Sequence, residues 1–161
     1  MKYPSRMEPI YSVVGAEALD ELTDMRMEFL LGLGHEEIVH DAVKLRSANR
    51  AFLEERLASG ACAGFLARLG GEAVSTLGIL TYSLPPLVGP EPRKVAHVLN
   101  VYTKPDYRGR GYATKLLELA IAWARERGYD RVFLNAMPAG EPLYRKLGFK
   151  ENEDKALMLR L

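Results

Sequence analysis

A short glycine-rich turn at residues 104–115 carries the clearest chemical signature in this 161-residue sequence. Gly109 and Gly111 lack a Cβ atom, so the backbone N–H groups around them can approach a bound anion closely. The helix predicted to begin at Tyr112 adds unpaired N–H donors and a partial positive charge at its first turn. One Asp is set against four basic residues, which gives a net charge of +3 from Lys104, Arg108, Arg110, Lys115 and Asp106. These features predict a binding site for phosphate or pyrophosphate.

The order of residues in this turn excludes two common phosphate-binding motifs. A Walker A loop ends in Lys-Ser or Lys-Thr after its last glycine, and this turn has no such ending. A dinucleotide-binding fingerprint has a third glycine where Thr114 stands, and it follows an early strand of the chain. The pattern that remains is Arg-x-x-Gly-x-Ala, formed by Arg108, Gly111 and Ala113.

This segment resembles the Q/R-x-x-G-x-G/A acetyl-CoA signature of the GNAT superfamily of N-acetyltransferases. A second resemblance lies downstream, where Leu-Asn-Ala at 134–136 is followed by Pro-Leu-Tyr-Arg-Lys-Leu-Gly-Phe at 142–149. These residues look like the family's second cofactor-side strand and its Leu-Tyr-x-x-Leu-Gly-Phe ending. The spacing of the two blocks agrees as well, and the resemblance is specific over residues 95–152. Over residues 8–94 it rests on the order of the elements.

The resemblance implies acetyl-CoA as co-substrate and no metal. In the family, two parallel strands splay apart and the pantetheine arm lies between them, and their counterparts here are residues 95–103 and 131–137. Val101 and Thr103 would contact the pantetheine through their backbone groups, and Asn135 would lie beside the thioester arm. The residues that would bind the pyrophosphate are Arg108, Gly109, Arg110, Gly111, Tyr112, Ala113 and Thr114.

The same resemblance assigns the catalytic roles. The Val101 amide would donate a hydrogen bond to the thioester carbonyl and stabilise the oxyanion. Tyr144 matches the family's general acid, and the ordinary pKa of a phenol, near 10, keeps it protonated at pH 7. Residues 95–101 contain no carboxylate, so the base is left among His97, Glu28 and solvent. Because the amine attacks the thioester directly, Cys62 needs no role.

The acceptor implied by the resemblance is a primary amine of a small molecule, a peptide or a protein. The sequence does not identify it further, because the first two helices and the loop at 85–94 have few distinctive residues. The candidates for its pocket are Glu28, Tyr82 and Asn100. Met25, Met27 and Phe29 are assigned either to the core or to the wall of such a pocket.

Structural and non-catalytic alternatives stay open. Tyr144 can be a core tyrosine, Asn135 can bond to the backbone at the end of a strand, and His97 can be a structural histidine. A non-catalytic CoA-binding sensor or partner module is the alternative function. A nucleic-acid-binding domain is disfavoured, because the chain has a net charge of +1 and no basic face with interleaved aromatic residues.

The elements that must position these residues follow from the apolar pattern of the sequence. Strands are predicted at 10–14, 61–69, 74–84, 95–103, 131–137 and 156–161, and helices at 19–30, 47–57, 112–127 and 141–147. The strand–helix–strand unit at 95–137 implies a parallel crossover. We expect a single α/β domain over 1–161. Its GNAT-like fold would have a mixed central sheet of six to seven strands, including splayed parallel strands, flanked by about four helices.

The composition of the chain indicates which partners and which cellular compartment to expect. Twenty-two basic residues against 21 acidic ones leave no overall field that selects nucleic acid or an anionic membrane. No apolar run approaches the ~20 residues that cross a bilayer. The lone Cys62 cannot form an internal disulfide and fits a reducing compartment. We expect a cytoplasmic protein with neither nucleic acid nor membrane as a partner, and a homodimer stays open as its assembly.

Overall fold

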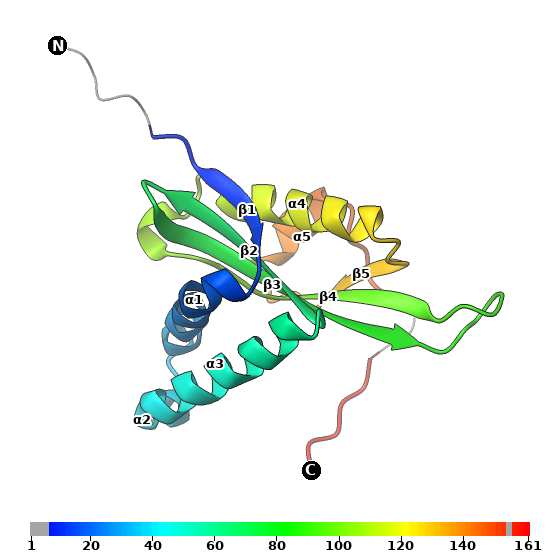
Figure 1. Cartoon of the computed structure of the whole chain (residues 1–161), viewed down its shortest axis with the longest axis horizontal. Coiled ribbons are helices and arrows are strands. Elements are labelled where there is room, and N and C mark those ends of the chain that lie inside the picture. Colours follow the sequence, from blue (N-terminus) through cyan, green and yellow to red (C-terminus); the bar gives the residue numbers. More distant parts are fainter. Residues whose placement is uncertain (1–6, 154–155) are drawn as a thin grey trace.

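Five strands form one mixed sheet with helices on both faces, in a computed structural model that describes residues 7–153 and 156–161 (Figure 1). The strands, in their order across the sheet, are β1 (Ile10–Val14), β2 (Cys62–Leu69), β3 (Glu72–Leu84), β4 (Arg93–Thr103) and β5 (Arg131–Leu134). The first four pair antiparallel, whereas β4 and β5 are parallel. The predicted parallel crossover is thus confirmed.

The helices cover the sheet from both sides. They are α1 (Leu19–Gly32), α2 (Glu36–His40), α3 (Ala42–Ala58), α4 (Tyr112–Glu126) and α5 (Glu141–Lys146), with 3-10 turns at η1 (Ala16–Ala18) and η2 (Pro105–Tyr107). Figure 1 shows α4 and α5 on one face and α1, α2 and α3 on the other. The four predicted helices correspond to α1, α3, α4 and α5, and α2 is one additional short helix. None of the described helices combines the length and the apolar composition that crossing a bilayer requires.

The core follows from the alternation of side chains along the central strands. One face of the sheet packs Phe65, Leu77 and Ile79 against the apolar stripe of α4, which includes the fully buried Leu116 and Leu117. The other face carries a smaller cluster of buried residues against α1, with Val14, Ala18, Leu22, Met25, Leu66 and Ala73. The sheet is therefore held rigidly between two layers of helices.

The sheet opens between β4 and β5. The two strands pair only from Val95 with Arg131 to Val98 with Leu134, so the later half of β4 has β3 alone as its neighbour. The pairing of β4 with β3 shifts register next to this point, between Thr76 and Gly78. Asn100 lies in this irregular stretch and has a positive φ of 56°, a backbone conformation that asparagine tolerates better than most residues. The bulge and the early end of pairing leave one edge of β4 open.

The predicted sheet of six to seven strands is wrong, because the described residues form a sheet of five. The strand expected at 131–137 ends at Leu134, and residues 156–161 form no strand. Large apolar side chains of this last segment are exposed, at Leu157, Met158, Leu159 and Leu161. An apolar pattern does not make a strand unless another strand edge accepts its hydrogen bonds. Of the predicted single domain 1–161, residues 1–6 and 154–155 lie outside the described residues.

Candidate active site

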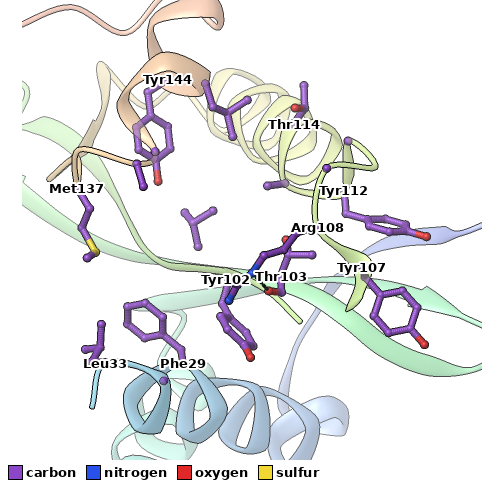
Figure 2. Close-up of a pocket in the computed structure, with 18 residues that line it drawn as sticks. Phe29, Leu33, Tyr102, Thr103, Tyr107, Arg108, Tyr112, Thr114, Met137 and Tyr144 are labelled. Atoms are coloured by element: carbon purple, nitrogen blue, oxygen red, sulfur yellow. Dashed lines mark hydrogen bonds between the residues drawn. The ribbon is translucent and has the colours of Figure 1, made fainter. Parts of the chain in front are cut away.

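A cleft of about 600 Å³ lies where β4 and β5 separate. Its walls come from α1, the end of β4, the turn before α4, and α5 with the turn that precedes it. Figure 2 shows Phe29 of α1 and Leu33, which follows that helix, on one side and Tyr144 of α5 on the other, with the Tyr144 ring directed into the space between them. Nine of the sequence-predicted site residues line the cleft: Val101, Thr103, Arg108, Gly109, Gly111, Tyr112, Ala113, Thr114 and Tyr144.

The turn before α4 has the conformation that its glycines permit. Gly109 and Gly111 have φ angles of 72° and 83°, in the left-handed region that strains other residues. A Cβ added at either position would meet no atom within 4 Å, so the backbone angle and not the available space requires glycine. Gly111 is the N-cap of α4, and no side chain caps the helix. The N–H groups of the first turn therefore have no intrahelical acceptor, and Tyr112, Ala113 and Thr114, which carry them, line the cleft.

The charge of the turn is smaller than the sequence alone indicates. Lys104 lies 2.7 Å from a carboxylate oxygen of Glu72, and Lys115 lies 2.9 Å from one of Glu118. The two arginines bind backbone carbonyls instead: Arg108 Nε donates to Thr103 at 3.0 Å, and Arg110 Nη2 donates to Asp106 at 2.9 Å. The positive charge that remains for a ligand is therefore that of the two arginines and the helix N-terminus.

Hydrogen bonds from β3 hold the end of β4 in place. The hydroxyl of Ser75, which is fully buried, donates to the carbonyl oxygen of Tyr102 at 3.0 Å and lies 2.8 Å from the hydroxyl of Thr103. The ring of Tyr102 lies edge-on to Phe29, with ring centroids 6.1 Å apart. The backbone from Val101 to Thr103 is therefore a fixed wall of the cleft.

Tyr144 is the tyrosine of this cleft that also lines the opening between β4 and β5. Its side chain is half-buried, and burial raises the pKa of the phenol above its ordinary value of 10.0. The phenol is therefore protonated and neutral throughout the physiological pH range. Its ring lies edge-on to Phe149, with centroids 6.0 Å apart. Phe149 thus packs against the ring, and Tyr144 lines both the cleft and the opening between β4 and β5, where its hydroxyl can donate a proton.

A smaller cavity of about 230 Å³ occupies that opening. Asn100 and Val101 line it from β4, Asn135 lines it from the end of β5, and Tyr144 lines it from α5. Val101, Tyr144 and Phe29 belong to both this cavity and the main cleft. The predicted thioester-side residues from three separate segments thus come together at the point where the strands part.

A known family matches most of the chain, including the cleft. The family model described as "Acetyltransferase (GNAT) family" matches residues 20–149. The chain belongs to the GNAT acetyltransferase family. An uncharacterized N-acetyltransferase of Methanocaldococcus jannaschii is 38% identical over 66 residues, a match that covers 39% of this chain and 29% of that protein. The chain thus aligns with less than a third of this curated relative.

Solved structures of acetyltransferases share the fold. A predicted acetyltransferase of Clostridium acetobutylicum, crystallised with acetyl-CoA, superimposes with a TM-score of 0.81 at 22% identity and covers 94% of this chain and 96% of its own. A GCN5-related N-acetyltransferase of Ralstonia eutropha gives 0.77 at 23% identity, over 94% and 99%. An aminoglycoside N-acetyltransferase in complex with CoA gives 0.69 at 20% identity, over 98% of each chain. At these identities the likeness establishes the GNAT fold.

Four predicted residues of this GNAT chain lie apart from the cleft. One is Arg110, whose guanidinium donates to the Asp106 carbonyl and lies over the ring of Tyr107. His97 packs between Phe133 and Tyr82, at centroid distances of 5.0 and 6.4 Å, and burial lowers the pKa of its imidazole. It lies four residues before Val101 along β4, which is about 13 Å of strand. The side chain of Tyr82 is exposed, and Glu28 lies 3.7 Å from Lys104. None of the four lines the cleft or the cavity at the opening.

Sequence reasoning missed three residues that shape this GNAT site. Met137, Ala139 and Gly140, in the segment between β5 and α5, line both the cleft and the cavity at the opening. Phe29, which the sequence assigns either to the core or to a pocket wall, lines both as well, whereas Met25 and Met27 are buried. Periodicity could indicate that Phe29 lies on the inner face of α1, but it carries no signal that the sheet opens opposite that residue.

Proposed function

We propose that the protein is an acetyl-CoA-dependent N-acetyltransferase that transfers the acetyl group to a primary amine of a small molecule, a peptide or a protein. The observation that carries the proposal is the meeting of two features in one cleft. The uncapped N-terminus of α4 follows left-handed glycines at one end, and the protonated hydroxyl of Tyr144 lies at the other. Between them, β4 has an edge that β5 does not cover.

Successive parts of the cleft suit the pyrophosphate, the pantetheine arm and the thioester end of acetyl-CoA. Main-chain N–H groups at 109–114, together with Arg108 and Arg110, would bind the pyrophosphate, since donors at a helix N-terminus favour anions. The open edge of β4 at Val101 and Thr103 would hydrogen-bond the pantetheine amides as a neighbouring strand does. Asn135, at the opening, would lie beside the thioester end.

Bound acetyl-CoA supplies an activated acetyl thioester. The protein would place the carbonyl at the opening between the strands, where the backbone amide of Val101 would stabilise negative charge on its oxygen. The hydroxyl of Tyr144 would give its proton to the departing sulfur, a type of general acid catalysis that contributes roughly 10²–10⁴-fold.

The attacking amine must be uncharged. Among the described residues that line the cleft, none is a histidine, an aspartate or a glutamate. This favours solvent over His97 and Glu28 as the acceptor of the amine proton. Asn100 remains a proposed acceptor contact because it lines the opening, whereas the exposed Tyr82 lies outside it.

The test is acetyl-CoA binding followed by turnover. Acetyl-CoA at millimolar concentration should raise the melting temperature by mass action, and a panel of amines and peptides should release free CoA thiol. No thermal shift would overturn the cofactor assignment. A thermal shift without thiol release for any amine or peptide would favour the non-catalytic CoA-binding module.

A further inference from the structure

We propose that the acceptor carries a carboxylate in addition to its amine, and that Arg26 binds this carboxylate in an apolar pocket between α1, α3 and the sheet. This proposal rests on the proposed function, because it names the class of amine that the enzyme would acetylate. The class is an amine with a carboxylate and an apolar group, such as an apolar amino acid.

The pocket lies on the face of the sheet opposite α4 and has a volume of about 360 Å³. Its walls are mostly apolar, with Leu22 and Phe29 from α1 and Phe52 and Leu53 from α3. The pocket shares Phe29, Leu99 and Asn100 with the cavity at the opening between β4 and β5. A ligand in this pocket would therefore reach the thioester end of the cleft through that opening.

Arg26 brings a positive charge to this pocket. Its side chain is half-buried, and its hydrogen bonds go to two neutral amides: Nε donates to Asn49, and Nη1 donates to Oδ1 of Asn100 at 3.4 Å. No carboxylate in the described part of the chain forms an ion pair with it. A guanidinium removed from water favours an anionic partner, and its planar fork suits a carboxylate.

The carboxylates of α1 are all engaged elsewhere. Each pairs with a different basic residue, in the pairs Asp20–Arg50 at 3.0 Å, Glu21–Arg68 at 2.6 Å, Asp24–Arg46 at 2.7 Å and Glu28–Lys104 at 3.7 Å. Arg26 is the one basic residue of α1, and it is the charged residue of this helix that faces the pocket. The pattern leaves one positive charge at the pocket for a ligand to neutralise.

Arg56 adds a second independent observation. Its guanidinium lies over the ring of Phe52, 5.2 Å from the centroid, on the α3 side of the pocket. Its Nε is buried and has no hydrogen-bond partner among the described residues. Arg26 therefore lines the apolar pocket, Arg56 packs against one of its lining residues, and neither forms an ion pair with a carboxylate among the described residues.

Two glycines form part of the floor of the pocket, and Gly78 leaves space there. Gly64 of β2 and Gly78 of β3 are direct partners across the sheet, and both line the pocket. A Cβ at Gly64 would lie 2.6 Å from Leu22, whereas a Cβ at Gly78 would meet only the carbonyl oxygen of Leu99, at 3.9 Å. A larger side chain at Gly78 would therefore enter the pocket and compete with a ligand.

The first experiment measures binding without requiring acetyl transfer. Isothermal titration compares 3-phenylpropionate with 3-phenylpropionamide, which has the same shape but no charge, on the wild type and on Arg26→Gln. We expect the carboxylate to bind the wild type at least tenfold more tightly, and this ratio to fall to about one in Arg26→Gln. Equal affinity of the two probes for the wild type, or an unchanged ratio in Arg26→Gln, would overturn the proposal.

Two further variants test whether the probes bind in this pocket, as opposed to responding to a general change of charge or of folding. Arg46→Gln removes an exposed arginine of α3 that is paired with Asp24, so it should leave the ratio unchanged. Gly78→Leu should weaken both probes at least tenfold while the thermal shift caused by acetyl-CoA is retained. Undiminished binding to Gly78→Leu would show that the probes bind elsewhere and would overturn the proposal.

The second experiment links the pocket to turnover. Acetylation of phenylalanine is compared with that of phenethylamine, which lacks the carboxylate. We expect kcat/KM to favour phenylalanine in the wild type and to show no such preference in Arg26→Gln. A preference for phenethylamine would overturn the carboxylate assignment. Carboxylate binding that depends on Arg26, combined with no acetyl-CoA binding, would instead overturn the proposed function and leave the carboxylate site standing.

Discussion

Gly140 leaves space that the ring of Tyr144 fills. A Cβ added at Gly140 would lie 2.9 Å from Cε2 of Tyr144, closer than real Cβ atoms approach, and 3.2 Å from its hydroxyl oxygen, which is a tight contact. The φ of Gly140 is −90°, a value that other residues adopt readily. Glycine is therefore required here because of the space the aromatic ring occupies and not because of its backbone. The position of the proposed general acid thus depends on a residue that carries no functional group.

Gly140→Ala should displace the hydroxyl of Tyr144 and slow acetyl transfer. Misplacing a reacting group by about 1 Å can cost up to roughly 10²-fold in rate, so we expect kcat to fall by about 10–100-fold. Steady-state thiol release with saturating acetyl-CoA measures the effect. The melting temperature, measured in parallel, shows whether the variant is folded.

A double substitution tests whether Gly140→Ala acts through the hydroxyl. In a Tyr144→Phe background the hydroxyl is already absent, so adding Gly140→Ala should change kcat little. If the two substitutions instead reduce kcat independently, Gly140 affects the site by another route.

The parts of the site that the sequence predicts are those that depend on local signals. Left-handed turns need glycine, so Gly109 and Gly111 mark the turn without any knowledge of the rest of the fold. The apolar stripe of α4 likewise follows from helical spacing, and the structure confirms that Leu116 and Leu117 are buried. Gly140 has no comparable signal, because its requirement arises only when the ring of Tyr144 is packed beside it.

The parts that the sequence does not predict depend on pairing between distant segments. Residues 156–161 have the composition of a strand, but the described residues offer them no partner. The loss of positive charge in the turn is similar, since Lys104 pairs with Glu72 of a neighbouring strand. The unpaired charge of Arg26 becomes evident only when every carboxylate of α1 is found beside another basic residue.

Tyr144→Phe should reduce turnover and leave cofactor binding nearly intact. The substitution removes the proton donor but keeps the ring, so we expect kcat to fall by roughly 10²–10⁴-fold. Burial raises the pKa of Tyr144 above 10.0, so any loss of wild-type activity that reflects ionisation of this phenol should occur only above pH 10. The pH profile of kcat, measured with and without the substitution, checks both statements.

Tyr129→Phe is the control for this substitution. Tyr129 stacks on Trp123, with ring centroids 5.4 Å apart, and does not line the cleft, so losing its hydroxyl should leave kcat within about twofold. Unchanged kcat in Tyr144→Phe would remove Tyr144 from the mechanism.

Gly111→Asp should abolish the thermal shift caused by acetyl-CoA. The substitution places a negative charge at the uncapped N-terminus of α4, where the pyrophosphate is proposed to bind, and like charges repel. Gly128→Asp is the matched control, because Gly128 has a similar φ of 69° and follows the other end of the same helix. Differential scanning fluorimetry with and without acetyl-CoA compares the two. Retention of the shift in Gly111→Asp would show that the cofactor binds elsewhere.

The Glu21–Arg68 pair should make stability depend on pH. Arg68 donates two hydrogen bonds to the carboxylate, at 2.9 and 2.6 Å, and these lower the pKa of Glu21 below its ordinary value of 4.5. A lowered folded-state pKa means that the pair stabilises the protein fully above pH 4.5 and less as the pH falls through the folded-state value. The Glu21 side chain is 39% exposed, so solvent screens the pair and we expect about 0.5–1 kcal/mol.

Glu21→Gln should therefore lower the free energy of unfolding by about 0.5–1 kcal/mol at pH 7. The difference from the wild type should shrink below pH 4.5 and disappear in acid, where Glu21 is protonated in both the folded and the unfolded state. Urea unfolding at a series of pH values measures it. Glu126→Gln is the control, because the Glu126 side chain is 76% exposed and lies 3.9 Å from Arg127, so its effect should be close to zero at every pH. If the difference for Glu21→Gln stays constant with pH, the amide disturbs the packing of α1 on β2 and charge has no part in it.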